Sequence, residues 1–403
     1  MCTLRCDSAK TATPDIPCSL PNLCICICSI FALDKLAASL IIFLSGAILL
    51  EKLPSGNFSR LGHVGQSYQV TQWFPKPAVY DKDGWHPMSY LDQGEFYSEF
   101  GNYDVSITLP KNYILMATGD LQNEEEIDFL NEKAKLTSRL IKENKLPVRD
   151  SFGRKDMSFP KSSLEKKTLR FVQNNVHDFA WFTDKRYHVL KGEVNVNNRK
   201  ITSWALFTNN EAKLWRRSIE YINDATRYFS KWVGEYPYSH VTAVDGTISA
   251  GGGMEYPNIT VIGNSGDSKS LETVIVHEVG HNWFYGILGS NERDNAWMDE
   301  GLNTYIEIRY MEEKYPYGYL QKKDSTQNKS RGISLNISLE EKELQHIAYQ
   351  FNASRNYDQP LKMGSKDFTQ MNYGAMVKHL GKYGDESRFL EKSLGFFNRS
   401  YRI

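Results

Sequence analysis

The sequence contains no cysteine after residue 28, because all six cysteines lie in the first 28 of its 403 residues. The rest of the chain therefore has no disulfide, no thiolate metal site and no cysteine nucleophile. The chain also lacks an excess of charge, since Lys and Arg total 48 and Asp and Glu also total 48. A balanced charge gives no reason to expect a nucleic-acid partner, and the sequence shows no internal repeat.

The composition is that of a globular protein. Hydrophobic residues make up 41% and aromatic residues 13% of the chain, so it can bury a sizeable core. The length of 403 residues corresponds to about two or three domains by the usual domain size.

The N-terminal part stands apart from this composition. Two uncharged apolar runs, residues 19–33 and 36–50, are separated only by an Asp-Lys pair. Each is shorter than the ~18–20 residues that span a bilayer, so together they predict one imperfect signal-anchor. Residues 1–52 are thus expected to be an apolar, Cys-containing leader or membrane anchor, with membrane association through residues 19–50. This predicts a membrane-anchored or cell-envelope protein. The alternative is an unstructured leader on a protein that is otherwise soluble.

Residues 53–196 are predicted to form a β-rich domain. The segments YDVSITL and YILMAT, between turn signals, are typical of strands. A highly charged insertion, residues 123–169, contains apolar residues at helical spacing and predicts a surface helix. Asn197-Asn198 predicts a turn, and after residue 210 the pattern is mostly helical. The fold class is therefore α+β, with a boundary near residue 196 and a mainly helical domain over residues 197–403.

The stretch HEVGH, residues 277–281, lies in an otherwise apolar run predicted to be a helix over residues 271–288. Positions i and i+4 share a helix face, so His277 and His281 can bind one ion through two imidazole nitrogens. Zn²⁺ favours such ligands, and a catalytic zinc usually has three protein ligands. Glu278 lies beside them, where a general base is needed.

A third ligand is expected on the helical segment predicted over residues 298–313. Eighteen residues separate His281 from Glu300, which precedes an apolar stripe. Two helices joined by a turn-rich loop can pack side by side, so Glu300 can complete a site for one zinc ion per chain. Asp299, the preceding residue, is the alternative third ligand.

These motifs carry a resemblance to a known family. HEVGHNWF, the spacing to Glu300 in WMDEGLNTY, and GGGMEYPN upstream resemble the aminopeptidase N-like zinc metallopeptidases, which are gluzincins. The resemblance covers about residues 53–380 and implies a thermolysin-like zinc peptidase domain. It also implies that His277, His281 and Glu300 bind the zinc ion and that Glu278 is the catalytic base.

The resemblance further implies how a substrate binds. Gly252, Gly253 and Met254 correspond to an edge strand that runs along a peptide, and Glu255 corresponds to the glutamate that binds its free α-amino group. Tyr256 stands where most members of the family have Asn. The partners implied are peptides with a free N-terminus.

The sequence departs from the family in other respects. The resemblance begins near Gly56, and the family continues beyond residue 403, so both domains are expected to be partial. The family's oxyanion-stabilising tyrosine should follow the Met-Val pair, where this chain has Lys378. Tyr373 is the nearest surrogate. A zinc aminopeptidase is the leading interpretation; the alternatives are a zinc endopeptidase with the same ligands and a catalytically decayed homologue that binds zinc or peptides.

Overall fold

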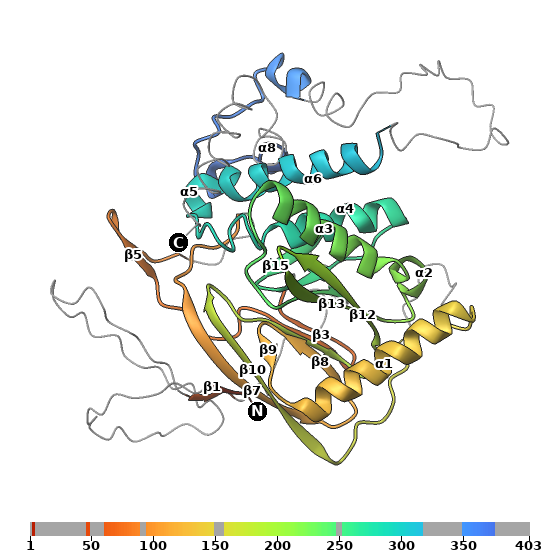
Figure 1. Cartoon of the computed structure of the whole chain (residues 1–403). Helices are drawn as coiled ribbons and strands as arrows, with labels where there is room; N and C mark the ends of the chain where they lie inside the picture. The colour runs from red at the N-terminus through yellow and green to blue at the C-terminus, as the bar shows by residue number, and fades with distance from the viewer. Residues whose placement is uncertain are drawn as a thin grey trace, which may run out of the picture.

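The computed structural model describes residues 60–88, 94–148, 157–246, 252–316 and 349–374, and the backbone of two short strands at residues 2–4 and 46–48. In this part of the chain the fold is a mixture of α and β structure (Figure 1). β-Sheets predominate in the N-terminal half and helices in the C-terminal half, which confirms the predicted fold class.

Two antiparallel sheets and a hairpin form the N-terminal half. The first sheet has the order β2-β1-β7-β10-β9 and the second β3-β4-β11-β8, whereas β5 and β6 pair only with each other. Their bounds are β1 Cys2–Leu4, β2 Gly46–Ile48, β3 Gly62–Val64, β4 Ser67–Val70, β5 Val79–Asp81, β6 Gly84–His86, β7 Gly101–Pro110, β8 Ile114–Ala117, β9 Asp120–Leu121, β10 Lys166–Val176 and β11 Trp181–Asp184.

A third sheet supports the motifs that the sequence singles out. Its order is β12-β13-β14-β16-β15, with β13, β14 and β16 parallel and the two outer strands antiparallel to their neighbours. The bounds are β12 His188–Val196, β13 Arg199–Phe207, β14 His240–Asp245, β15 Gly253–Tyr256 and β16 Ile259–Ile262. β15 is therefore an edge strand of this sheet.

Helices α3, α4 and α6 gather on one side of the third sheet, and α1 lies away from them (Figure 1). Helices α3, α4 and α6 share with it a large hydrophobic core, whereas α1 packs against β12. Their bounds are α1 Glu124–Lys142, α2 Ala212–Trp215, α3 Ser218–Trp232, α4 Ser268–Gly280, α5 Glu292–Ala296, the π-helix η1 Trp297–Gly301, α6 Leu302–Lys314, the 3₁₀-helix η2 Ser365–Asp367 and α8 Gln370–Asn372.

The boundary expected near residue 196 falls within a β-hairpin. Asn197 and Asn198 both have positive φ, as a tight turn between paired strands requires, so the predicted turn is confirmed. Strands β12 and β13 pair along their whole lengths on either side of it. The residues after 197 thus contribute four strands to this sheet, with α2 and α3 between β13 and β14. Strands β14 and β16 are buried on both faces and show no polar alternation.

The helix predicted over residues 271–288 is shorter than expected. Helix α4 ends at Gly280, and residues 281–288 continue as consecutive turns. Tyr285 has a φ of 73°, which a right-handed helix cannot accommodate. The apolar pattern continues beyond the helix because the turns are buried as well.

The expected membrane anchor lies almost wholly outside the described residues. In the part of the chain that the structure describes, none of the helices combines the length and the hydropathy that a membrane crossing requires. Anchoring through residues 19–50 stays a prediction.

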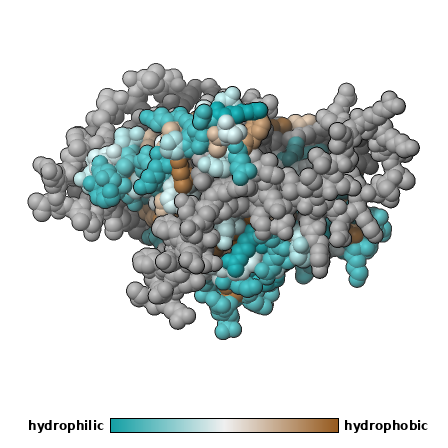
Figure 2. Space-filling view, turned by 90° about the horizontal axis from the view of Figure 1, so that it is seen from above, coloured by the Kyte–Doolittle hydropathy of each residue, from teal (hydrophilic) through white to brown (hydrophobic). Residues whose placement is uncertain are grey.

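In the view from above, the described residues on the visible surface are mainly hydrophilic, with smaller hydrophobic areas between them (Figure 2).

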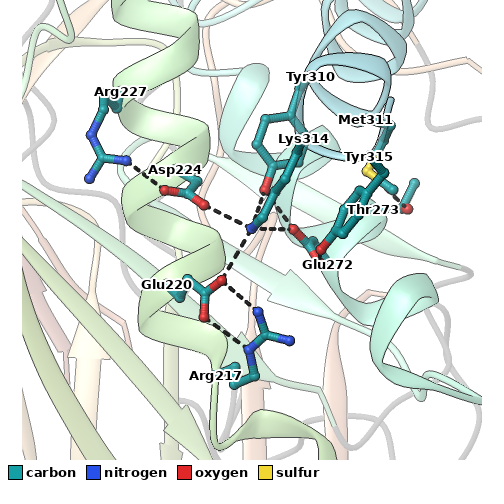
Figure 3. A network of polar contacts seen from close by, with 10 residues as sticks. All are labelled: Arg217, Glu220, Asp224, Arg227, Glu272, Thr273, Tyr310, Met311, Lys314 and Tyr315. Atoms are coloured by element: carbon teal, nitrogen blue, oxygen red, sulfur yellow. Dashed lines mark hydrogen bonds and ion pairs between the residues drawn. The ribbon is translucent and has the colours of Figure 1, made fainter. Parts of the chain in front are cut away.

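A buried polar network fixes α4 against α3 and α6 (Figure 3). The Nζ atom of Lys314, at the end of α6, lies 2.6 Å from Glu272 on α4 and 2.8 Å from Asp224 on α3. Glu272 is completely buried, and it also accepts hydrogen bonds from Tyr310 (2.6 Å) and Tyr315 (2.7 Å). Since a buried carboxylate is tolerated only when it is paired, this network holds the three helices in register.

Candidate metal centre

Helix α4 carries the HEVGH motif into the core. Asp267 caps its N-terminus by accepting hydrogen bonds from the backbone N–H groups of Lys269 (2.8 Å) and Ser270 (3.0 Å). At the other end, a Cβ atom on Gly280 would lie 2.0 Å from Asn303 and 2.4 Å from Phe229. Only glycine therefore lets α3 and α6 approach α4 this closely, and the motif becomes buried between them.

The two histidines of the motif point at each other. The Nε2 atoms of His277 and His281 are 3.2 Å apart. The Nδ1 atom of His277 lies 2.9 Å from Glu307, and that of His281 lies 2.5 Å from Asp299. When both Nδ1 atoms donate to these carboxylates, both Nε2 atoms present a lone pair to the same point.

Glu300 completes this convergence from η1. Its Oε2 atom lies 3.0 Å from Nε2 of His277 and 3.8 Å from Nε2 of His281. Glu300 and Asp299 both lie in the π-helical turn, a wider turn that is frequent at functional sites. Consecutive carboxylates thereby take different positions: Glu300 reaches the Nε2 atoms, whereas Asp299 reaches Nδ1 of His281 from behind.

The three converging atoms fit a zinc ion. Zinc–nitrogen bonds of 2.0–2.1 Å in tetrahedral geometry place ligand atoms about 3.3 Å apart. The separations here are 3.2, 3.0 and 3.8 Å, and all three side chains are buried. Two lone pairs that face each other in a buried site repel unless a cation lies between them. The donor set therefore fits zinc, whereas Asp299 contacts Nδ1 of His281, on the other side of that ring.

Strand β15 places Glu255 beside this group. The turn between β15 and β16 is attached to the end of α4, because the Asn258 backbone N–H donates to Asn282 Oδ1 at 2.9 Å. A Cβ atom on Gly253 would lie 2.6 Å from the Glu278 carboxylate, so any larger residue there would displace this carboxylate. A Cβ atom on Gly252 would lie at an ordinary contact distance of 3.8 Å from Val274, and Met254 is buried in the core. The ligand atoms of Glu255, Glu278 and His281 lie within 4.8 Å of one another.

The site is strongly acidic. Burial, aided by the neighbouring carboxylates Glu95, Asp299 and Glu278, raises the pKa of Glu255 well above its ordinary value, although His281 counteracts part of this rise. The Oε1 atom of Glu255 is buried and has no hydrogen-bond partner among the described residues. Such a group is stable as a carboxylate only beside a cation.

Two further acids surround the centre. Glu95, from the N-terminal half, forms a bidentate ion pair with Arg60, with one contact at 2.5 Å. Glu292 on α5 is completely buried, and burial together with Asp299 and other nearby carboxylates raises its pKa well above the ordinary value. The acidic cluster thus combines both halves of the described chain.

Tyr373 lies at the end of α8 and contacts this cluster. Its hydroxyl group donates to Glu292 Oε1 at 3.2 Å. Burial and the neighbouring carboxylates Glu292 and Glu300 raise the pKa of Tyr373 far above its ordinary value, so the phenol stays protonated. An oxyanion donor must be protonated, but this hydroxyl is engaged with Glu292 in the structure.

Sequence reasoning missed Glu307, Glu292 and the pair of Arg60 with Glu95. Glu307 follows Glu300 by two helical turns, so the two carboxylates lie on the same side of their helical segment. This spacing could have identified Glu307 as a second partner of the histidines. The other acids come from segments far apart in the chain, and no local pattern marks them.

Part of the chain is similar in sequence to known peptidases. Residues 217–371 match the model of the Peptidase family M1 domain. Leukotriene A-4 hydrolase of Xenopus laevis is 38% identical over 61 residues, which are 14% of this chain and 10% of that protein. Aminopeptidase B of Homo sapiens is 36% identical over 61 residues, which are 14% of this chain and 9% of that protein.

Solved structures are similar over a larger share of the chain. The M1 zinc metallopeptidase from Deinococcus radiodurans aligns with 15% sequence identity and a TM-score of 0.45, over 74% of this chain and 57% of that one. By contrast, the sequence matches to leukotriene A-4 hydrolase and aminopeptidase B span only about a tenth of the length of those proteins.

Proposed function

We propose that this protein is a zinc-dependent aminopeptidase, which hydrolyses the N-terminal peptide bond of peptides, because residues 217–371 match the model of the Peptidase family M1 domain. The observation that carries the proposal is the convergence of His277 Nε2, His281 Nε2 and Glu300 Oε2, with Glu255 and Glu278 beside them.

His277, His281 and Glu300 would hold one zinc ion per chain. A zinc ion bound there supplies Lewis acidity, which polarises a carbonyl group. Asp299 and Glu307 fix the two imidazole rings by accepting hydrogen bonds from their Nδ1 atoms.

Glu278 acts as the general base. Its carboxylate takes a proton from the attacking water and later gives it to the nitrogen of the leaving amine. Gly253 leaves the space that this carboxylate occupies, so the base is held beside the edge strand rather than in bulk solvent. Tyr373 is the proposed hydrogen-bond donor to the oxyanion of the substrate. To act in this way, its hydroxyl group must give up the hydrogen bond to Glu292 and donate to the substrate instead.

Glu255 selects the substrate. Strand β15 is an edge strand, so its free backbone groups can pair with an extended peptide. The buried oxygen of Glu255, which has no hydrogen-bond partner among the described residues, then meets the α-ammonium group of that peptide. This pairing sets the scissile bond one residue from the N-terminus.

The test is the hydrolysis of one peptide with a free and with an acetylated N-terminus. The aminopeptidase proposal expects cleavage of the free peptide only. Cleavage of both would favour a zinc endopeptidase with the same ligands. Cleavage of neither by a zinc-loaded protein would favour a decayed homologue that retains the metal group.

A further inference from the structure

Glu255 and Glu278 come from different elements, yet their carboxylates lie side by side. Glu255 is on β15 and Glu278 on α4, and their oxygen atoms are within 4.8 Å of each other. Both residues are buried, with 8% and 5% of their surfaces exposed. Two buried carboxylates at this separation repel each other unless a cation or a shared proton lies between them.

The backbone of β15 explains their proximity. Alternate residues of a strand point to the same face, so Gly253 and Glu255 face α4 together. The Glu278 carboxylate fills the space above Gly253, where a Cβ atom would be only 2.6 Å from Oε1. Glu278 is thereby held next to Glu255 on the same face of the strand.

No neighbouring cation in the described part of the chain neutralises Glu255 by direct contact. Arg60 is close enough to influence Glu255, but the two side-chain hydrogen bonds of its guanidinium group go to Glu95. Oε1 of Glu255 is buried without a hydrogen-bond partner among the described residues. The described residues thus offer this oxygen no compensating charge by direct contact, and a bound cation would supply one.

We propose that Glu255 and Glu278 form a second binding site for a divalent cation such as zinc, adjacent to the site of His277, His281 and Glu300. His281 belongs to the first site, because its Nε2 atom faces His277 and its Nδ1 atom faces Asp299. The second cation is thus held by two carboxylates and completes its coordination with water, so it binds more weakly than the first.

A cation in the second site inhibits the protein. It occupies the carboxylate that would meet the α-ammonium group, and it engages the carboxylate that would accept a proton from water. This inhibition rests on the proposed function, whereas binding of the second cation does not.

Equilibrium dialysis against rising concentrations of free Zn²⁺, followed by metal analysis, tests the proposal. We expect the parent protein to bind a second zinc ion at higher concentration than the first. Glu255→Gln should lose the second ion and keep the first. Glu278→Gln should do the same, and it serves as the second variant if Glu255→Gln does not fold. Glu292→Gln, which neutralises a buried carboxyl of the same cluster, is the matched control and should retain both ions.

Saturation of the parent at a single zinc ion would overturn the proposal, and so would a second ion that persists in both Glu255→Gln and Glu278→Gln. These results are separable from the proposed function. The cation site would be supported, and the aminopeptidase proposal contradicted, by two results together. The parent would bind a second ion but show no peptidase activity, and Glu255→Gln would lose that ion. Aminopeptidase activity in a protein that binds only a single zinc ion would do the reverse.

Discussion

The Nδ1 atom of His277 lies 2.9 Å from a carboxylate oxygen of Glu307, on the same helical segment that follows Glu300. One stretch of chain, η1 and α6, therefore supplies a carboxylate to each nitrogen of this imidazole, since Glu300 lies 3.0 Å from Nε2. Asp299 holds the Nδ1 atom of His281 in the same way. Such partners fix the tautomer and the direction of a metal-binding histidine.

Glu307→Ala should weaken zinc binding without abolishing it. Loss of such a hydrogen-bond partner typically lowers metal affinity by about 10- to 100-fold, because the ring becomes free to turn and less basic. Competition with a zinc chelator measures the dissociation constant. Glu313→Ala, a half-exposed position on the same helix, is the control. Equal affinities in the parent and Glu307→Ala would show that Glu307 does not support the site.

Glu278→Gln should retain zinc and lose hydrolysis. Proton transfer by a positioned base contributes about 10²- to 10⁴-fold to rate, and an amide cannot accept the proton. Metal analysis and kcat measurements on the same preparation separate the two effects. A variant that lost the first zinc ion would mean that Glu278 is a ligand of it.

Glu255→Ala should weaken the hydrolysis of peptides with a free N-terminus. A charge-assisted contact contributes about 1.5–3 kcal/mol, so kcat/KM should fall roughly 10- to 200-fold. Acetylated peptides should be poor substrates of both proteins and little changed, because they have no ammonium group to lose. Comparing kcat/KM for one peptide in both forms is the measurement. An equal loss for both forms would remove the α-amine role.

Lys314→Met should destabilise the fold. It leaves the completely buried Glu272 without its cation, a change that costs about 3 kcal/mol or more in comparable buried pairs. Chemical denaturation gives the difference in unfolding free energy. Lys231→Met, which removes a largely exposed partner of Glu313, should cost less than about 1 kcal/mol. Similar costs for the two variants would contradict the importance of this network.

His177 should make stability fall in acid. Burial lowers its pKa from 6.5 to about 3 in the folded protein. Between these values the unfolded chain binds a proton that the folded chain does not, so stability decreases as pH falls from 6.5 towards 3.

The matching variant is His177→Phe, which keeps a ring against Tyr285 and Phe100 and removes the titration. Its unfolding free energy should depend on pH less steeply than that of the parent, by up to about 1.4 kcal/mol per pH unit in this window. Parallel pH profiles of the two proteins would show that His177 is protonated equally in both states.

The sequence by itself determined the features that arise within short stretches of chain. The spacing of His277 and His281 follows from the period of one helix, and the Asn197-Asn198 turn follows from residues that tolerate positive φ. The mixture of strands and helices was predictable for the same reason, because the period of apolar residues reports which faces are buried.

Only the tertiary structure decided which groups meet across the site. Asp299 and Glu300 are adjacent and chemically alike, and the π-helical turn alone directs Glu300 to the Nε2 atoms and Asp299 to Nδ1 of His281. The contact of Tyr373 with Glu292, and the approach of Glu255 to Glu278, join segments whose packing no local pattern encodes. Such contacts depend on how distant elements fill one core, and periodicity within an element carries no information about its neighbours.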